Sequence, residues 1–212
     1  MLRAIGWALA AMALVGCQGE DEPDEEAVAP AQTGEVPTPA ASSSAVADGD
    51  AQAANSGGFS SQYTPLDLAA CTVTDSESEE GQWAERTCHG YRGVSLFVDD
   101  GDGRFDIDAG VRNEKFQSLG AFNDPPETIE WRMKDGAPFA IIYRLTDASP
   151  EDAGRTVLMV ERIGTAQQPG CTVAQVEGSR QDANVRAREF ADRTAAGFDC
   201  AAAKPEAVGN AR

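Results

Sequence analysis

Basic residues are scarce in this chain. Its 212 residues include 17 Lys and Arg against 35 Asp and Glu, which gives a formal net charge of -18. The deficit is deepest over residues 18–59, which hold nine acids and no base. Nucleic acids and anionic lipid headgroups require basic surfaces, so we exclude both as partners. A basic protein or a metal cation suits this charge better, although solubility alone also explains it.

Histidine and the common catalytic motifs are also lacking. His89 is the only histidine, and metal sites and nucleophile–base pairs usually need histidine together with partner residues. We therefore expect a strand or surface histidine. No Gly-x-Ser-x-Gly, His-Glu-x-x-His, phosphate-loop or dinucleotide motif occurs. The 35 acids do not single out a pair for glycoside hydrolysis. These absences predict a protein that is not an enzyme.

The first apolar run is too short for a transmembrane helix. It covers residues 5–15 and follows Arg3, which predicts a signal peptide over residues 1–16. Leu14-Val15-Gly16-Cys17 resembles the lipobox of bacterial lipoprotein precursors. The resemblance implies cleavage after Gly16 and a lipid on Cys17 that anchors the protein in a membrane. Gln18, in place of the Asp typical of inner-membrane retention, favours the outer membrane facing the periplasm. The alternative is an ordinary signal peptide with Cys17 as an unmodified thiol.

Four cysteines follow Cys17: Cys71, Cys88, Cys171 and Cys200. An even number beyond a secretion signal predicts two disulfides in an oxidising compartment. Three pairings are possible, and we favour Cys71–Cys88 with Cys171–Cys200 because each joins neighbours in sequence. A four-thiolate zinc site would normally show Cys-x2-Cys pairs, and the chain has none.

The chain divides by composition into an acidic tether and one domain. Residues 17–59 have almost no large apolar side chain to offset the entropy of ordering. We expect a disordered tether there, a globular domain over 60–201 and a flexible tail over 202–212.

Alternating apolar residues predict an antiparallel sheet in the domain. Strand-like runs occur at 71–74, 85–89, 94–98, 104–107, 128–133, 139–146, 155–163 and 171–176. Lys134-Asp135-Gly136 is typical of a hairpin turn. Residues 110–127 are expected to form a short helix or a packed loop. One amphipathic helix is predicted over 179–196, with Ser179 and Asp182 as a capping arrangement. The predicted fold is α+β: an antiparallel sheet of six to eight strands with a C-terminal helix packed on it.

Residues 63–200 resemble an uncharacterised family of secreted bacterial proteins. The resemblance depends on YTPLDLAAC, CHGYRGVSLFV followed by DGD, SLGAFN, TIEWRMKDGAPFAIIYRL, VLMVERIG, AREFADR and FDC. It implies no activity, cofactor or catalytic residue.

An acidic stretch over residues 99–108 is the sharpest local motif. Asp100, Asp102 and Asp106 on a glycine-bent loop are candidate calcium ligands. The pattern resembles the end of an integrin-type calcium loop, but Val98 occupies the first ligand position and cannot coordinate through its side chain. The alternative is a β-hairpin whose Asp-Gly steps supply positive φ. The two are compatible, with weak calcium binding as the only cofactor interaction predicted.

Three aromatic residues were considered for ligand binding: Trp83, Trp131 and Tyr91. Trp131 lies on an alternating strand and is expected in the core, whereas Trp83 in an acidic loop is expected to be exposed and is our candidate binding residue. The leading hypothesis is a lipoprotein without catalytic activity that binds a partner or serves as an envelope component. One alternative is an inhibitor of a basic cell-wall hydrolase such as lysozyme. Another is a calcium-dependent envelope module or hydrolase that uses residues 99–108.

Overall fold

A computed structural model of the protein describes residues 58–79 and 81–211. The expected signal peptide, Cys17 and nearly all of the tether lie outside these residues. Within the described part of the chain, no helix is long and apolar enough to cross a membrane.

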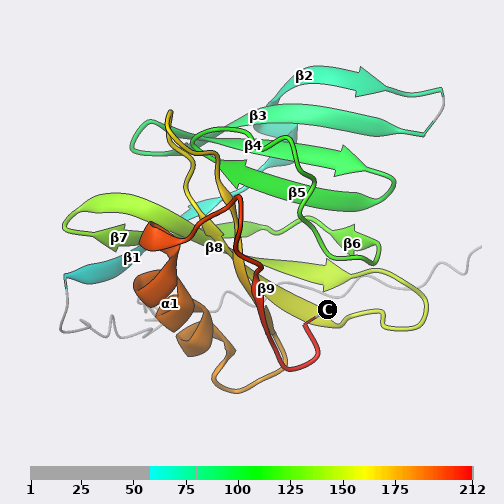
Figure 1. The fold of residues 1–212 in the computed structure, drawn as a ribbon. Helices are drawn as coiled ribbons and strands as arrows, with labels where there is room; N and C mark the ends of the chain where they lie inside the picture. Colours follow the sequence, from blue (N-terminus) through cyan, green and yellow to red (C-terminus); the bar gives the residue numbers. More distant parts are fainter. Residues whose placement is uncertain (1–57, 80, 212) are drawn as a thin grey trace, which may run out of the picture. The chain divides into compact units, whose positions relative to one another are not determined.

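The described residues form two β-sheets and one α-helix (Figure 1). Sheet A has the strand order β1-β7-β8-β9-β10-β11, with β6 paired to β8, and sheet B has the order β2-β3-β4-β5. The strands of sheet A are β1 (Phe59–Pro65), β6 (Asn123–Asp124), β7 (Thr128–Lys134), β8 (Ala137–Asp147), β9 (Thr156–Arg162), β10 (Cys171–Glu177) and β11 (Glu206–Val208). The strands of sheet B are β2 (Thr72–Glu77), β3 (Trp83–Tyr91), β4 (Val94–Gly101) and β5 (Arg104–Ala109), and the helices are η1 (Leu68–Ala70), α1 (Ala183–Thr194) and η2 (Ala195–Gly197).

Two-residue turns with positive φ connect three consecutive pairs of strands. Asp102 and Gly103 join β4 to β5 with φ of 54° and 68°, and Asp135 and Gly136 join β7 to β8 with φ of 51° and 82°. Such turns match the twist of antiparallel strands and favour Asp-Gly. Both hairpins predicted from the sequence are therefore confirmed. Arg92-Gly93 makes the third turn, between β3 and β4.

Sheet A is buried on both faces, which explains the almost continuous apolar runs of β8 and β9. Ile141, Tyr143 and Leu145 of β8 pack with Leu96, Val98 and Ile107 of sheet B in one core. Ala140 and Ile142 point to the opposite face and pack with α1. Sheet A is thus the middle of three layers, between sheet B and the helix.

The helix is shorter than predicted but buries the expected face. It spans Ala183–Thr194 and continues as η2 to Gly197, with Ala183, Ala187, Phe190 and Ala191 buried. The expected capping arrangement is absent at this end: Asp182 occupies the N-cap without a side-chain cap bond, and the Ser179 hydroxyl donates to Glu177 instead.

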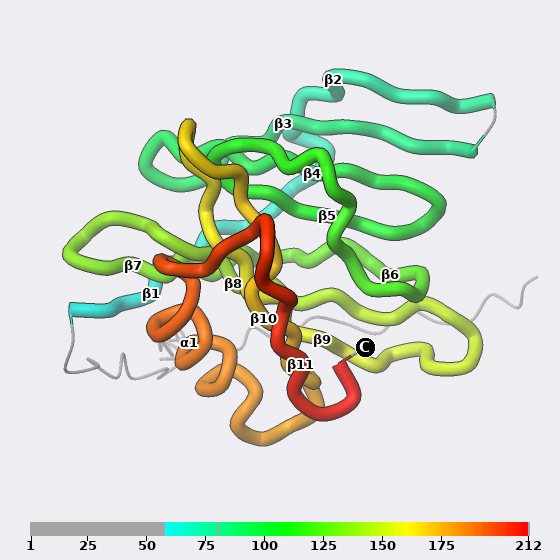
Figure 2. Tube along the Cα trace, viewed as in Figure 1, coloured from blue at the N-terminus to red at the C-terminus, as the bar shows by residue number. Residues whose placement is uncertain are grey.

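The α+β fold with a packed C-terminal helix is confirmed, with two differences. Sheet A is mixed because β11 runs parallel to β10 (Figure 2). The expected flexible tail is therefore corrected, since three of its residues are hydrogen bonded to β10 at the edge of the sheet. The Asn210 amide also donates to Glu177 Oε2 at 3.0 Å, and Ala211 is buried. Three residues, Glu206–Val208, are thus enough to pair with the otherwise exposed edge of β10.

Both favoured disulfides are confirmed. Cys71–Cys88 joins the start of β2 to β3, and Cys171–Cys200 joins β10 to the chain that follows the helix. Each closes a loop of 17 or 29 residues, for which chain entropy predicts about 3 kcal/mol of stabilisation.

Candidate functional site

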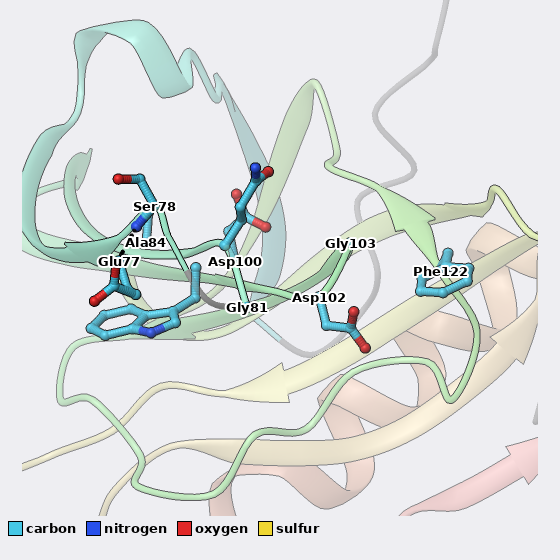
Figure 3. A pocket seen from close by; sticks show the side chains of 10 residues that line it. Glu77, Ser78, Gly81, Ala84, Asp100, Asp102, Gly103 and Phe122 are labelled. Carbon is cyan, nitrogen blue, oxygen red and sulfur yellow. Dashed lines mark hydrogen bonds between the residues drawn. The ribbon is translucent and has the colours of Figure 1, made fainter. Parts of the chain in front are cut away.

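A groove lies at the ends of the β2–β3 and β4–β5 hairpins. It encloses about 680 Å³ and is lined by Glu77, Ser78, Gly81, Gln82, Trp83, Ala84, Asp100, Asp102, Gly103 and Phe122. Figure 3 shows Glu77 at one end, Phe122 at the other, and Asp100 and Asp102 between them. We call this the aromatic–acidic groove, because its lining combines two large aromatic rings with three carboxylates.

Trp83 is the first residue of β3 and is partly exposed. Its strand neighbours are Glu77 on β2 and Gly101 on β4. Because Gly101 has no side chain, the indole has no cross-strand partner on β4. The sequence-based choice of Trp83 as a candidate binding residue therefore coincides with a hollow of the structure.

Two further hollows adjoin the groove on either side of the β4–β5 turn. One, of about 200 Å³, includes Trp83, Asp99, Asp100 and Phe116. The other, of about 480 Å³, includes Asp102 and Phe122. Phe116 and Phe122 are 48% and 49% exposed. Large apolar side chains that stay exposed beside a hollow are typical of binding surfaces.

The three predicted calcium ligands are not brought together. Asp100 pairs in register with Phe105, whereas Asp106 pairs with Asp99, so Asp100 and Asp106 point to opposite faces of sheet B. Asp102 is exposed at the turn and pairs with Arg104 at 2.9 Å, and Asp100 lies 3.5 Å from Arg86. Across the described residues, no three His, Cys, Asp or Glu side chains are placed to hold a metal ion. The two-residue alternation of a strand is what separates these carboxylates.

The other residues singled out from the sequence have structural surroundings. Trp131 is fully buried, and its indole N–H donates to Thr64 Oγ1 at 2.8 Å. Tyr91 packs against the Trp131 ring with centroids 6.0 Å apart. Neither ring is therefore placed to stack on a sugar. His89 is exposed on β3.

Three carboxyl groups meet in the interior and form no ion pair with a basic side chain of the described residues: Asp106 and Asp108 on β5 and Glu161 on β9. Their exposed fractions are 3%, 3% and 1%. We call them the carboxyl cluster. Burial raises the pKa of Asp106 to about 6 and the pKa of Asp108 to about 7. Burial and the neighbouring aspartates also raise the pKa of Glu161 well above its usual value.

The proximity of the three acids favours the retention of protons. The negative charges of Asp108 and Asp106 raise the pKa of Glu161 after burial has already done so, and Tyr143 Oη donates to Glu161 Oε2 at 3.4 Å. Asp106 Oδ1 and Glu161 Oε1 are buried and accept no hydrogen bond from an N–H or O–H group of the described residues. Buried oxygens without donors favour the protonated state, because an isolated buried charge is costly.

The same carboxyls hold the chain that follows β5, residues 110–122, which we call segment 110–122. The Asn113 amide donates to Asp108 Oδ2 and the Gln117 amide donates to Asp106 Oδ2, each at 2.7 Å. This segment carries both Phe116 and Phe122. Of the two forms expected here, a helix or a packed loop, the structure shows the packed loop.

Segment 110–122 begins at a glycine that no other residue could replace without strain. Gly110 has a φ of 83°, and a Cβ there would lie 2.3 Å from the carbonyl oxygen of Gly164. At the other side, the Asn113 side chain donates to Gly170 O and the Thr172 amide donates to Gln117 Oε1. The segment is therefore fixed to β5 and to the start of β10.

Sequence reasoning missed the carboxyl cluster. The available signal was the alternation of acids with apolar residues in Arg104–Ala109, which places Asp106 and Asp108 on one face of β5. Glu161 follows the buried run of β9 in the same way. The sequence alone does not indicate that β5 and β9 lie next to each other.

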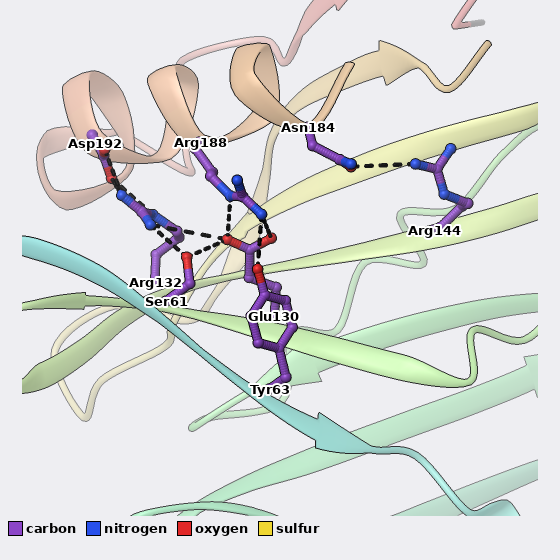
Figure 4. Close-up of polar contacts among 8 residues, drawn as sticks. All are labelled: Ser61, Tyr63, Glu130, Arg132, Arg144, Asn184, Arg188 and Asp192. Carbon is purple, nitrogen blue, oxygen red and sulfur yellow. Dashed lines mark hydrogen bonds and ion pairs between the residues drawn. The ribbon is translucent and has the colours of Figure 1, made fainter. Parts of the chain in front are cut away.

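A second buried polar cluster lies between α1 and sheet A (Figure 4). Arg132 donates three hydrogen bonds to Asp192, at 2.6, 2.7 and 3.0 Å, and Arg188 donates to Glu130 at 2.7 Å and to Tyr63 Oη at 2.7 Å. The bond to Glu130 raises the pKa of Arg188 further above its usual value. Every charge in this cluster has an opposite partner, which indicates a structural role in fixing the helix.

Comparison of the chain with protein-family models, with curated proteins and with solved structures finds no match in any of the three.

Proposed function

We propose that the protein is a lipid-anchored binding protein of the cell envelope, without catalytic activity, that uses its aromatic–acidic groove to bind a cationic segment of a partner protein. The observation that carries the proposal is the placement of Trp83 and Phe122 beside Glu77, Asp100 and Asp102 in one hollow. Lysine and arginine bind to such surfaces through carboxylates and through the face of an indole ring.

The distribution of charge supports a cationic ligand. Residues 72–105, which contain all of sheet B except the end of β5, hold eight acids and three arginines. Residues 179–194, on the helix side, hold three acids and four arginines. The acidic excess is therefore concentrated around the groove, and it would steer a basic partner there at low ionic strength.

The raised carboxyl pKa values do not favour an enzyme. Perturbed acids in a cleft are candidate catalytic groups, but Asp106, Asp108 and Glu161 are almost completely buried, and none of them lines the groove or the two hollows beside it. The acids that do line the groove are at the surface. This arrangement supports binding rather than proton transfer.

The membrane anchor is supported by the Leu14-Val15-Gly16-Cys17 sequence and by the two disulfides, which form in oxidising compartments. The tether over residues 17–59 would hold the domain at a distance from the lipid on Cys17. The expected location is the outer membrane facing the periplasm. A Cys17→Ser variant should lose incorporation of labelled palmitate, and retention of the label would contradict the anchor.

The ligand proposal is tested with a lysine octamer titrated into the mature protein by calorimetry. We expect binding at low salt that weakens at least about tenfold at 0.15 M salt. Trp83→Ala should weaken it about fivefold, which corresponds to about 1 kcal/mol for a cation–aromatic contact. Val185→Ala is the control, because Val185 is 55% exposed on the helix, away from the groove residues. A glutamate octamer that binds equally well, or a Trp83→Ala variant with unchanged affinity, would refute this site.

A basic cell-wall hydrolase such as lysozyme is a second candidate partner, favoured by the same groove and by the net charge of -18. In that case the protein would inhibit the hydrolase. An activity assay at low and moderate salt decides this, since the absence of inhibition at low salt eliminates the candidate.

A further inference from the structure

The carboxyl cluster and segment 110–122 form one mechanical unit. Two of the three carboxyls accept the amide hydrogen bonds that fix the segment, and the third, Glu161 on β9, is close enough for the charges of Asp108 and Asp106 to raise its pKa. Phe116 and Phe122, which line the hollows around Trp83, are carried by this segment. The position of Phe116, which lies between the two amides held in this way, therefore depends on a buried group of acids that forms no ion pair with a basic side chain in the part of the chain that the structure describes.

We propose that the carboxyl cluster is a proton-dependent clamp that holds segment 110–122 closed while its carboxyls share protons and releases it when they ionise. When closed, the segment presents Phe116 and Phe122 beside Trp83. When the clamp opens, water reaches the carboxylates and Phe116 loses its fixed position. The effect on ligand affinity rests on the proposed function of the groove, whereas the opening itself does not.

The groups that face the cluster come from every element packed against it. Asp99 on β4 adds negative charge, and Arg112 of the segment pairs with Asp99 and lies 3.2 Å from Glu85. From β8, Tyr143 contributes a hydroxyl whose own pKa is raised by burial and by Glu161. Thr172 of β10 is uncharged and contacts Gln117. Arg112 thus pairs with Asp99 and Glu85, and its charge only partly offsets the ionisation of Asp106, whose pKa stays raised.

The direction of the pH response follows from the protonation of the aspartates, which bind protons more tightly in the closed state than in the open state. The pKa of Asp108 is about 7 when closed and that of Asp106 about 6, against 3.8 for a solvated aspartate. For each aspartate, the equilibrium constant for opening rises about tenfold per pH unit between the pKa of the solvated side chain and the pKa in the closed state. The clamp is therefore closed at mildly acidic pH and opens progressively as the pH rises through 6 to 7.

The experiment is amide hydrogen exchange, resolved by residue, on the mature protein between pH 5 and pH 8, with rates corrected for the intrinsic effect of pH. The amides of Asn113 and Gln117 should lose at least about tenfold in protection between pH 5 and pH 7, while amides within α1 keep theirs. Equal losses in α1 would mean global destabilisation, and constant protection in the segment would also overturn the clamp.

A variant pair separates the cluster from general charge effects. Asp108→Asn removes the carboxyl with the higher pKa and should reduce the pH dependence of the segment. Glu127→Gln, an exposed residue just after the segment, should leave it unchanged. An unchanged pH profile in Asp108→Asn refutes the proposal. If this variant does not fold, carbon-13 titration of Asp106 and Asp108 in the unmodified protein decides instead, since midpoints below pH 5 for both would refute it.

Titration with the lysine octamer at pH 5.5 and pH 7.5 connects the clamp to the groove. Weaker binding at the higher pH, with a smaller difference in Asp108→Asn, is expected. A pH-dependent segment with no octamer binding at either pH would refute the proposed ligand and leave the clamp standing. Octamer binding together with a segment whose exchange does not depend on pH would support the proposed ligand and refute the clamp.

Discussion

The two faces of sheet A bury polar clusters of opposite design. On the helix side, Glu130 and Asp192 each meet an arginine, so the cluster contains as many cations as anions. On the side facing sheet B, Asp106, Asp108 and Glu161 contact one another, Tyr143 and two backbone amides, and form no ion pair with any basic side chain that the structure describes. Both clusters are buried, but only the first is neutral through ion pairing. The second becomes neutral by binding protons, and this difference makes one a fixed joint and the other sensitive to pH.

The largest expected effect comes from breaking the paired cluster. Arg132 has a side chain only 3% exposed and donates to both Asp192 oxygens. Arg132→Ala should lower the free energy of unfolding by about 3–5 kcal/mol, because the nearly buried Asp192 carboxylate loses its partner and is left with uncompensated charge. Urea denaturation measures this.

The double variant Arg132→Met with Asp192→Leu is the control for this change. Removing both partners together should recover most of the lost stability, since no charge is left buried alone. If the double variant were as unstable as the single one, packing rather than charge would explain the loss.

In the carboxyl cluster, removal of a charge should stabilise the protein. Asp108 has a folded pKa of about 7, raised from 3.8, so its contribution to stability is complete below about pH 4 and is lost as the pH rises to 7. Asparagine has no carboxyl group to ionise, so the Asp108→Asn variant does not lose stability in this way. Its stability relative to the unmodified protein should therefore increase by up to about 3 kcal/mol between pH 5 and pH 7.

Denaturation at a series of pH values measures that difference directly. Subtracting the two curves removes the contributions of the other acids, which both proteins share. A difference that stays constant with pH would show that Asp108 is already ionised in the folded state at pH 5.

Local patterns predicted most of the fold, and long-range pairing accounts for what was missed. Alternation in Thr128–Lys134 and the Asp-Gly turns predicted hairpins correctly, because these depend on neighbouring residues. The division into two sheets and the pairing of β11 with β10 depend on contacts between distant segments. The same limit applies to the site. Trp83 was identified from its acidic surroundings, but Asp106 was assigned to a calcium loop with Asp100 because its partner on β9 lies 55 residues further along the chain.

The smallest effect is expected for the exposed ion pairs of the helix. It tests whether burial explains why a buried ion pair contributes more to stability than an exposed one. Arg186 pairs with Asp182 at 3.1 Å and with Glu189 at 3.2 Å, and its side chain is 49% exposed. Arg186→Ala should change the free energy of unfolding by less than about 0.5 kcal/mol, because solvent screens both pairs and alanine is itself a good helix former. Denaturation at 0.05 and 0.5 M salt should give the same result within error. A loss approaching that of Arg132→Ala would mean that the number of ion pairs, and not their burial, determines how strongly the helix is held.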